Sequence, residues 1–221
     1  MSDITAGAVS SQAVVDLLGM LAYAELLAFD RMAGDAALAP DLRRRAVLSE
    51  MAGVEISNYR RVSDRLVHLG ADPEDAMAPF RAALDAYHGQ TQPGDWLEAL
   101  TKAYVGDSIA DDFAREVARG LSPPDRDLVL DVRHESRYAD FAVDEIRQAL
   151  IDDQSQTHRL SMWARRLVGE ALSQAQRVAA ERPAFTELLA KAAEAEGDVA
   201  AMLKRLTAAH TTRMAAIGLN N

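Results

Sequence analysis

Apolar residues recur at three- and four-residue spacing along almost the whole chain, and no run of residues alternates apolar with polar. This spacing predicts helices and argues against strands, so we expect an all-α protein. Proline, glycine and capping residues mark where the helices begin and end. They predict long helices over residues 11–34, 40–70, 91–120 and 121–150, a shorter helix over 73–89, and C-terminal helices over 156–180 and 184–216.

The order of these helices predicts a four-helix bundle. Two long helices are followed by the short one and then by two more long helices, so one crossover connects the two halves of the bundle. We expect the bundle to span residues 10–152, and a C-terminal helical pair over residues 153–218 to pack on it as an extension. The composition, 49% hydrophobic and 26% charged, is that of a globular protein with a substantial core.

Polar residues interrupt the apolar face of each long helix near its middle. An isolated carboxylate is strongly disfavoured in a protein interior, so acids at such positions indicate ion pairs or a metal site. The chain has no cysteine, so a metal would be held by oxygen and nitrogen atoms. The interrupting residues are Glu25 in the first long helix, Glu55 and Asn58 in the second, Asp107 in the third, and Glu135 and Tyr138 in the fourth.

The four acids among these residues are also predicted to lie at one height in the bundle. The turn at Pro40 lies midway between the first two acids, and the turn at Leu121 lies midway between the other two. In an antiparallel helix pair, two residues at equal distance from the turn lie side by side. A layer of four carboxylates is the arrangement that a site for two metal ions needs.

Four segments carry a resemblance to a known family: AYAELLAFDRMA, MAGVEISNYRRVSDRLVHLGADP, YVGDSIADDFAREVA and HESRYADFAVDEI. They resemble the ferritin-like di-iron carboxylate superfamily, and within it the bacterial proteins similar to the tRNA hydroxylase that oxidises the isopentenyl group of a modified adenosine. The likeness covers residues 15–150. It implies a ferritin-like bundle and two iron ions per chain, with Glu25, Glu55, Asp107 and Glu135 as carboxylate ligands.

The chain departs from the pattern of that superfamily at two positions. Two of its helices carry Glu-x-x-His, but here Asn58 and Tyr138 stand where the imidazoles are expected. An Asn amide is a weak oxygen donor, and a Tyr phenolate binds iron but favours the ferric state. A second register on the fourth helix stays open, in which Asp131 and His134 supply the carboxylate and the nitrogen. We therefore expect the site to bind iron weakly, to bind another ion, or to bind no metal.

Two functions follow from these observations. By resemblance, the first is a non-haem di-iron hydroxylase that acts on modified tRNA or on a small hydrophobic substrate. The second is a non-catalytic helical interaction protein that has lost the metal, acting through its surface or as a homodimer. The net charge of −10 argues against a general phosphate-binding surface and so weakens tRNA as the substrate.

The chain carries no sign of export or of a membrane span. The N-terminal MSDITAGAVSSQ lacks the basic and apolar regions of a signal peptide, and no apolar run approaches the roughly 18 residues of a spanning helix. We expect a cytoplasmic protein without a membrane partner. The remaining histidines, at positions 68, 88, 158 and 210, lack a second ligand at helical spacing and are expected at the surface.

Overall fold

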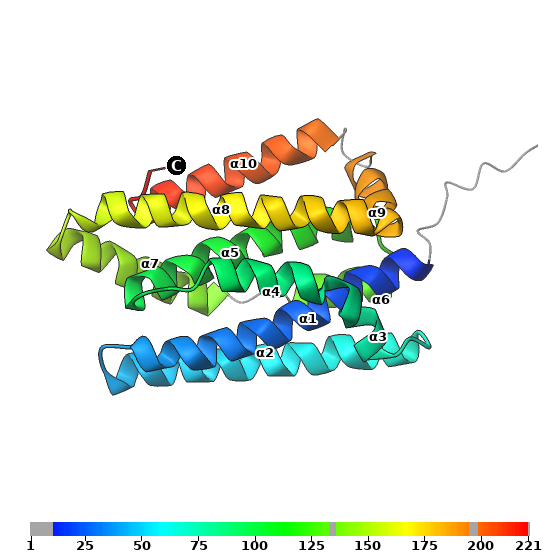
Figure 1. The fold of residues 1–221 in the computed structure, drawn as a ribbon, viewed down its shortest axis with the longest axis horizontal. Helices are drawn as coiled ribbons and strands as arrows, with labels where there is room; N and C mark the ends of the chain where they lie inside the picture. The colour runs from blue at the N-terminus through cyan, green and yellow to red at the C-terminus, as the bar shows by residue number, and fades with distance from the viewer. Residues whose placement is uncertain (1–10, 133–135, 195–198, 221) are drawn as a thin grey trace, which may run out of the picture.

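The computed structural model describes the backbone of residues 11–132, 136–194 and 199–220, and it leaves the side chains of residues 133–138 and 194–199 undescribed. All regular elements in the described part of the chain are helices (Figure 1). The expected all-α class is therefore confirmed.

The long helices begin and end close to where the sequence predicts. Each start is fixed by a capping residue where the sequence offers one: the carboxylate of Asp41 accepts a hydrogen bond from the backbone N–H of Arg44, and that of Asp95 accepts one from Glu98. The long helices are α1 (Ser11–Asp35), α2 (Leu42–His68), α5 (Trp96–Ala118) and α8 (Gln156–Glu181). In place of the fourth bundle helix lie α6 (Pro123–Val132) and α7 (Ser136–Asp152), on either side of the undescribed residues 133–135.

Two predicted helices are divided in the structure. The crossover consists of α3 (Pro73–Met77), a 3-10 turn η2 (Ala78–Phe80) and α4 (Arg81–Gln90), because Pro79 has no N–H to continue the helical ladder. A shorter 3-10 turn, η1 (Ala36–Leu38), follows α1. The single helix expected over 184–216 is wrong: α9 (Pro183–Glu194) and α10 (Val199–Ala216) run in clearly different directions (Figure 1).

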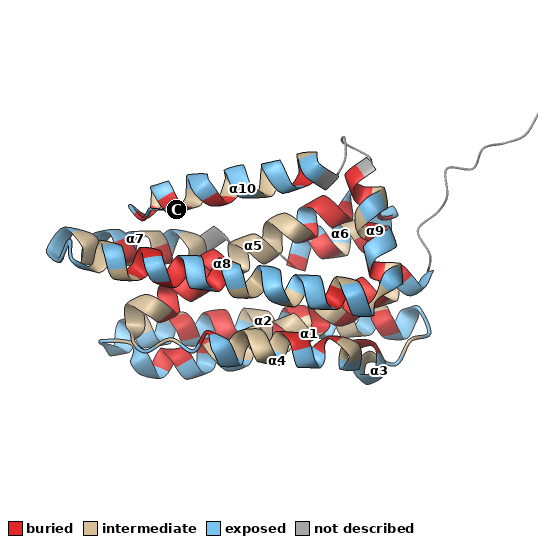
Figure 2. Cartoon of the chain, turned by 45° about the horizontal axis from the view of Figure 1, so that its top comes forward, coloured by how far each residue is buried: buried red, intermediate tan, exposed pale blue. Residues whose placement is uncertain are grey.

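Helix α5 is the central element of the fold. It packs against α6, α7, α8 and α10, and its residues 99–105 are all buried. Helices α1 and α2 lie side by side along their length, while α4 and α8 contact each other on another side of the bundle. The outer helices α8 and α10 alternate between buried and exposed segments, as amphipathic helices do (Figure 2).

The apolar interior consists of two clusters that share no residue. One cluster contains Leu17, Leu66 and Val117, and the other contains Leu48, Leu100 and Ile146, each with further residues from these and other helices. Along α1, α2 and α5 the two clusters are separated by a short stretch that carries the polar residues singled out in the sequence. Along these three helices, Glu25, Glu55, Asn58 and Asp107 thus fall between two apolar cores.

Arginine–carboxylate pairs connect helices that are distant in the sequence. Arg65 on α2 donates to Asp125 on α6 over 2.8 Å, and Arg205 on α10 donates to Glu116 on α5 over 2.6 Å. The hydrogen bond from Arg205 lowers the pKa of Glu116. Three further pairs of this kind are Arg182–Asp16, Arg213–Asp112 and Arg44–Glu145.

By length and hydropathy alone, the segment Ser11–Leu38 is long and apolar enough to cross a membrane. However, 56% of its most apolar window is buried inside the fold, where α1 packs against α2, α3 and α9. This burial is the behaviour of a core helix.

A close approach between α1 and α3 leads to the first prediction. Gly19→Ala should lower the free energy of unfolding by about 1–3 kcal/mol, because overpacking a tight contact is costly. The added methyl group would lie 2.1 Å from the carbonyl oxygen of Ala76. Urea denaturation would measure the change. As the control, Gly53→Ala meets nothing within 4 Å and should stabilise α2 by about 0.5–1 kcal/mol. Equal stability of Gly19→Ala and wild type would contradict this contact.

Candidate functional site

The first two predicted site residues lie on the adjacent helices α1 and α2. Glu25 is fully buried, with 0% of its surface exposed, and Glu55 is half-buried. A carboxylate without any solvent contact requires neutralisation by a proton, a cation or hydrogen-bond donors. Glu25 is therefore the acid whose placement most resembles that of a metal ligand.

Asp107 is held by an arginine. Both of its carboxylate oxygens accept hydrogen bonds from Nη2 of Arg31 on α1, each over 3.1 Å. The Arg31 side chain is only 7% exposed, whereas that of Asp107 is 37% exposed. The guanidinium thus carries a full positive charge to the mid-height of the bundle, where a metal ion is expected from the sequence.

Asn58 has a structural partner in the interior. Its side chain is 7% exposed, and Nδ2 donates a hydrogen bond to the backbone carbonyl of Val132 on α6 over 3.0 Å. Since a carbonyl can only accept, the amide nitrogen must face it. The Asn58 side chain therefore links α2 to α6 through a bond that an imidazole would have to replace.

The remaining candidates lie largely outside the described residues. This holds for Glu135 and His134 entirely and for the side chain of Tyr138, so their part in a site stays a prediction. Asp131, the acid of the second register, forms an exposed ion pair with Arg61. Among the residues that the structure describes, no three acidic or histidine side chains gather as a metal ion requires. The convergence of all four acids, which includes Glu135, stays a prediction.

A second polar cluster lies beside Arg31, where α1, α4 and α5 meet. Lys102 is 3% exposed, and its Nζ donates a hydrogen bond to the carbonyl of Thr91 over 2.6 Å. Asp35 is 9% exposed, and its Oδ2 lies 4.0 Å from Nη1 of Arg31. Two cations and two carboxylates, counting Asp107, therefore balance one another within this end of the bundle.

Burial shifts the pKa values of this cluster. It lowers the pKa of Lys102 to about 8, with a further contribution from the charge of Arg31. It also lowers the pKa of His88 to about 3, and the charges of Lys102 and Arg31 act in the same direction. Burial raises the pKa of Asp35 in spite of both cations, and it raises the pKa of the Tyr87 phenol. At neutral pH, His88 is thus a neutral imidazole.

This cluster was not predicted from the sequence, and two histidines lie deeper in the fold than predicted. His88 is half-buried and His210 is 9% exposed, so the expectation that both lie at the surface is wrong. Arg31 and Lys102 gave one signal: each is a cation in a mostly apolar stretch of a core helix. Buried acids and buried bases have to be considered together, because each compensates the other.

The Asn58 contact leads to the second prediction. Asn58→Leu should destabilise the protein by about 1–3 kcal/mol, because it removes the donor to a buried carbonyl. Chemical denaturation would measure the loss. In the matched control, Ser57→Ala removes an exposed hydrogen bond to the carbonyl of Gly53 and should change stability by less than about 0.5 kcal/mol. If the two variants were equally stable, Asn58 would not link α2 to α6.

His88 leads to a pH prediction. The pKa of His88 is about 3 in the folded protein and 6.5 in the unfolded chain. Between these two pH values, His88 is therefore protonated in the unfolded chain and neutral in the folded protein. Neutral His88 makes its full contribution to the free energy of unfolding above pH 6.5. At lower pH this contribution should decrease by up to about 1.4 kcal/mol per pH unit. Denaturation at pH 7, 6 and 5 should show a shallower decline for His88→Gln. Parallel curves for the two proteins would refute the shift.

The fold resembles that of a solved structure. Curated proteins gave no match. A solved structure, described as "Protein 19 with aldehyde deformylating oxidase activity from Synechococcus", superimposes with a TM-score of 0.70 at 16% identity, covering 97% of this chain and 93% of that one. At this identity the likeness shows the fold alone.

The family comparison covers most of the chain and agrees with the observed bundle. The matching family model is described as "Ferritin-like domain, actinomycetes" and spans residues 9–192. The protein therefore belongs to this ferritin-like family, and the ferritin-like fold expected from the sequence is confirmed.

Proposed function

We propose that this protein is a metal-independent member of the ferritin-like family, a helical interaction protein rather than an oxygenase. In this proposal Arg31 supplies the interior positive charge that metal ions supply in the di-iron enzymes of the fold. The fold itself does not decide between these functions, because one fold hosts many activities. The proposal therefore rests on the contacts of individual side chains.

The observation that carries the proposal is the pairing of Asp107 with Arg31. Both oxygens of Asp107 accept hydrogen bonds from the guanidinium, so a cation of the protein itself already neutralises this carboxylate and holds its orientation, and a metal ion would have to compete with it. A metal ion beside Arg31 would also meet a full positive charge that is buried and hence poorly screened. These two effects oppose metal binding at this carboxylate.

The donor set as a whole also fits two iron ions poorly. The two positions of the imidazoles carry Asn58 and Tyr138, and the Asn58 amide donates to Val132. Iron ligated by Glu25, Glu55, Glu135 and Tyr138 would lack the neutral nitrogen ligands that suit the ferrous state, and only the second register, with His134, would supply one. The described residues thus favour a bundle held together without the metal.

The competing function is a non-haem di-iron hydroxylase, and one observation favours it. Glu25 is a fully buried carboxylate next to the helix that carries Glu55, which is half of a metal-binding pattern. The aldehyde chemistry of the solved neighbour would make a small hydrophobic substrate the better choice for such an enzyme. The net charge of −10 opposes modified tRNA as the substrate. A cytoplasmic location and a homodimer remain expectations under either function.

The fourth prediction concerns the strength of the Arg31–Asp107 pair. In a double-mutant cycle of Arg31→Met and Asp107→Asn, the coupling energy should be about 1–2 kcal/mol, because the pair is charged and partly buried and Nη2 of Arg31 contacts both carboxylate oxygens. As the matched control, Arg177→Met with Glu181→Gln breaks an exposed pair on α8 and should couple by less than about 0.5 kcal/mol. A coupling energy near zero for Arg31 and Asp107 would remove the main support for the proposal.

The fifth prediction concerns iron itself. Protein purified from iron-supplemented cells should contain well below stoichiometric iron by elemental analysis. Asn58→His with Tyr138→His supplies the imidazoles, and adding Arg31→Met to this pair also frees Asp107. The triple variant should therefore bind more iron than the double variant. Wild-type protein with about two iron ions per chain, the number in di-iron bundles, would overturn the proposal in favour of the hydroxylase.

A further inference from the structure

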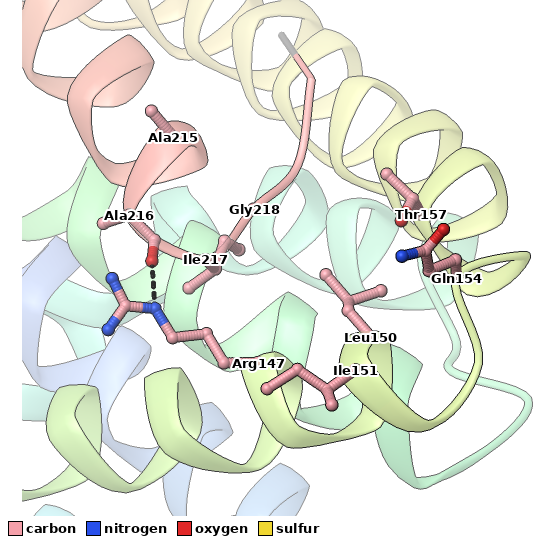
Figure 3. A pocket seen from close by; sticks show the side chains of 9 residues that line it. All are labelled: Arg147, Leu150, Ile151, Gln154, Thr157, Ala215, Ala216, Ile217 and Gly218. Carbon is pink, nitrogen blue, oxygen red and sulfur yellow. Dashed lines mark hydrogen bonds between the residues drawn. The ribbon is translucent and has the colours of Figure 1, made fainter.

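A surface hollow of about 500 Å³ lies away from the polar mid-layer, where α7 ends and α10 ends (Figure 3). Its lining residues come from the last turns of α7, from the connection to α8, from the first turn of α8, and from residues 215–218. This volume falls within the range of small-molecule pockets in proteins. The hollow belongs to neither the candidate metal site nor the cluster around Lys102.

Arg147 stands at one end of this hollow with its guanidinium already oriented. Its Nε donates a hydrogen bond to the carbonyl of Ala216, the last residue of α10, over 2.6 Å. The two Nη groups form the other edge of the planar fork, the geometry that pairs with a carboxylate. Within the described part of the chain, Arg147 has no carboxylate partner, unlike Arg31, Arg65 and Arg205.

The middle of the hollow is apolar. Figure 3 shows Leu150, Ile151 and Ile217 between Arg147 at one end and Gln154 and Thr157 at the other. Ile151 is 73% exposed, which is a large apolar side chain left in water at the rim of a hollow. A ligand that covered it would gain the free energy of removing this apolar surface from water.

We propose that this hollow binds a linear amphipathic carboxylate, of the class of medium-chain fatty acids. The carboxylate pairs with the Nη edge of Arg147, and the chain lies over Leu150, Ile151 and Ile217. An acid with one negative charge fits better than a phosphate ester with two, because the protein itself carries a net charge of −10. The inference goes beyond the proposed function and holds whether or not the protein takes up iron.

The test is a titration of the full-length, ¹⁵N-labelled wild-type protein with octanoate at pH 7, followed by NMR. The backbone amides of Ile151 and Gly218 should shift in a saturable way. Octanol, which has the same chain without the charge, should bind at least about tenfold more weakly, as expected for the loss of a charge-assisted pair. Octyl phosphate tests the other anionic head group and should also bind more weakly than octanoate.

Two variants separate the two parts of the site. Arg147→Gln should weaken octanoate binding at least about tenfold, and Ile151→Ser should weaken it several-fold through the lost apolar contact. Because Ile151 is exposed, the second variant should fold normally even if the first does not. The matched controls are Arg43→Gln and Leu172→Ser, which change an exposed arginine and an exposed leucine elsewhere and should leave binding unchanged.

Three results would overturn the inference. One is octanoate binding that is equal in wild type and in both pocket variants. Another is octanol or octyl phosphate binding as tightly as octanoate. The third is a set of shifts spread over the surface without saturation, which would indicate detergent-like adsorption. Iron content does not enter any of these readouts, so they are independent of the outcome for the metal.

Discussion

The structure depends on the compensation of carboxylates in the interior of a helical bundle. A carboxylate removed from water costs several kcal/mol unless a cation or hydrogen-bond donors replace the solvent. Here arginines from other helices do so, as in the pairs Asp16–Arg182, Asp107–Arg31, Glu116–Arg205 and Asp125–Arg65. Each pair joins elements far apart in the sequence, so the neutralisation of the acids also fixes which helices lie together.

A di-iron enzyme of the same fold solves this problem by another route. Metal ions neutralise several carboxylates at once, but they require free oxygen lone pairs and neutral nitrogen ligands in a fixed geometry. An arginine neutralises one carboxylate through directed hydrogen bonds and leaves no coordination position for a substrate or for dioxygen. The contact between Arg31 and Asp107 therefore distinguishes a bundle whose acids are neutralised by arginine from one whose acids are neutralised by metal ions. The helices around the contact are the same in both cases.

Hydrophobic periodicity was sufficient to predict the helices, since a 3.6-residue repeat over long segments matches the helical turn and does not match the two-residue repeat of a strand. The unusual position of Glu25 could also be recognised from the sequence, because the other residues on the same face of its helix are all apolar. The role of Arg31 could not be recognised in this way, since its long side chain reaches an acid on another helix and sequence spacing does not reveal that partner. The direction change between α9 and α10 depends on packing against α5, which is a property of the assembled bundle. The role of Asn58 depends in the same way on the carbonyl of Val132.

The division of the interior into two apolar clusters has a consequence for how the protein opens. Cooperative units in proteins follow contiguous packing, and here no core side chain belongs to both clusters. The continuous hydrogen-bonded backbones of α1, α2 and α5 cross the polar layer between them. Loosened packing in one cluster is therefore transmitted to the other along the helix backbones and not through side-chain contacts. The two ends of the bundle can thus unfold locally and independently of each other.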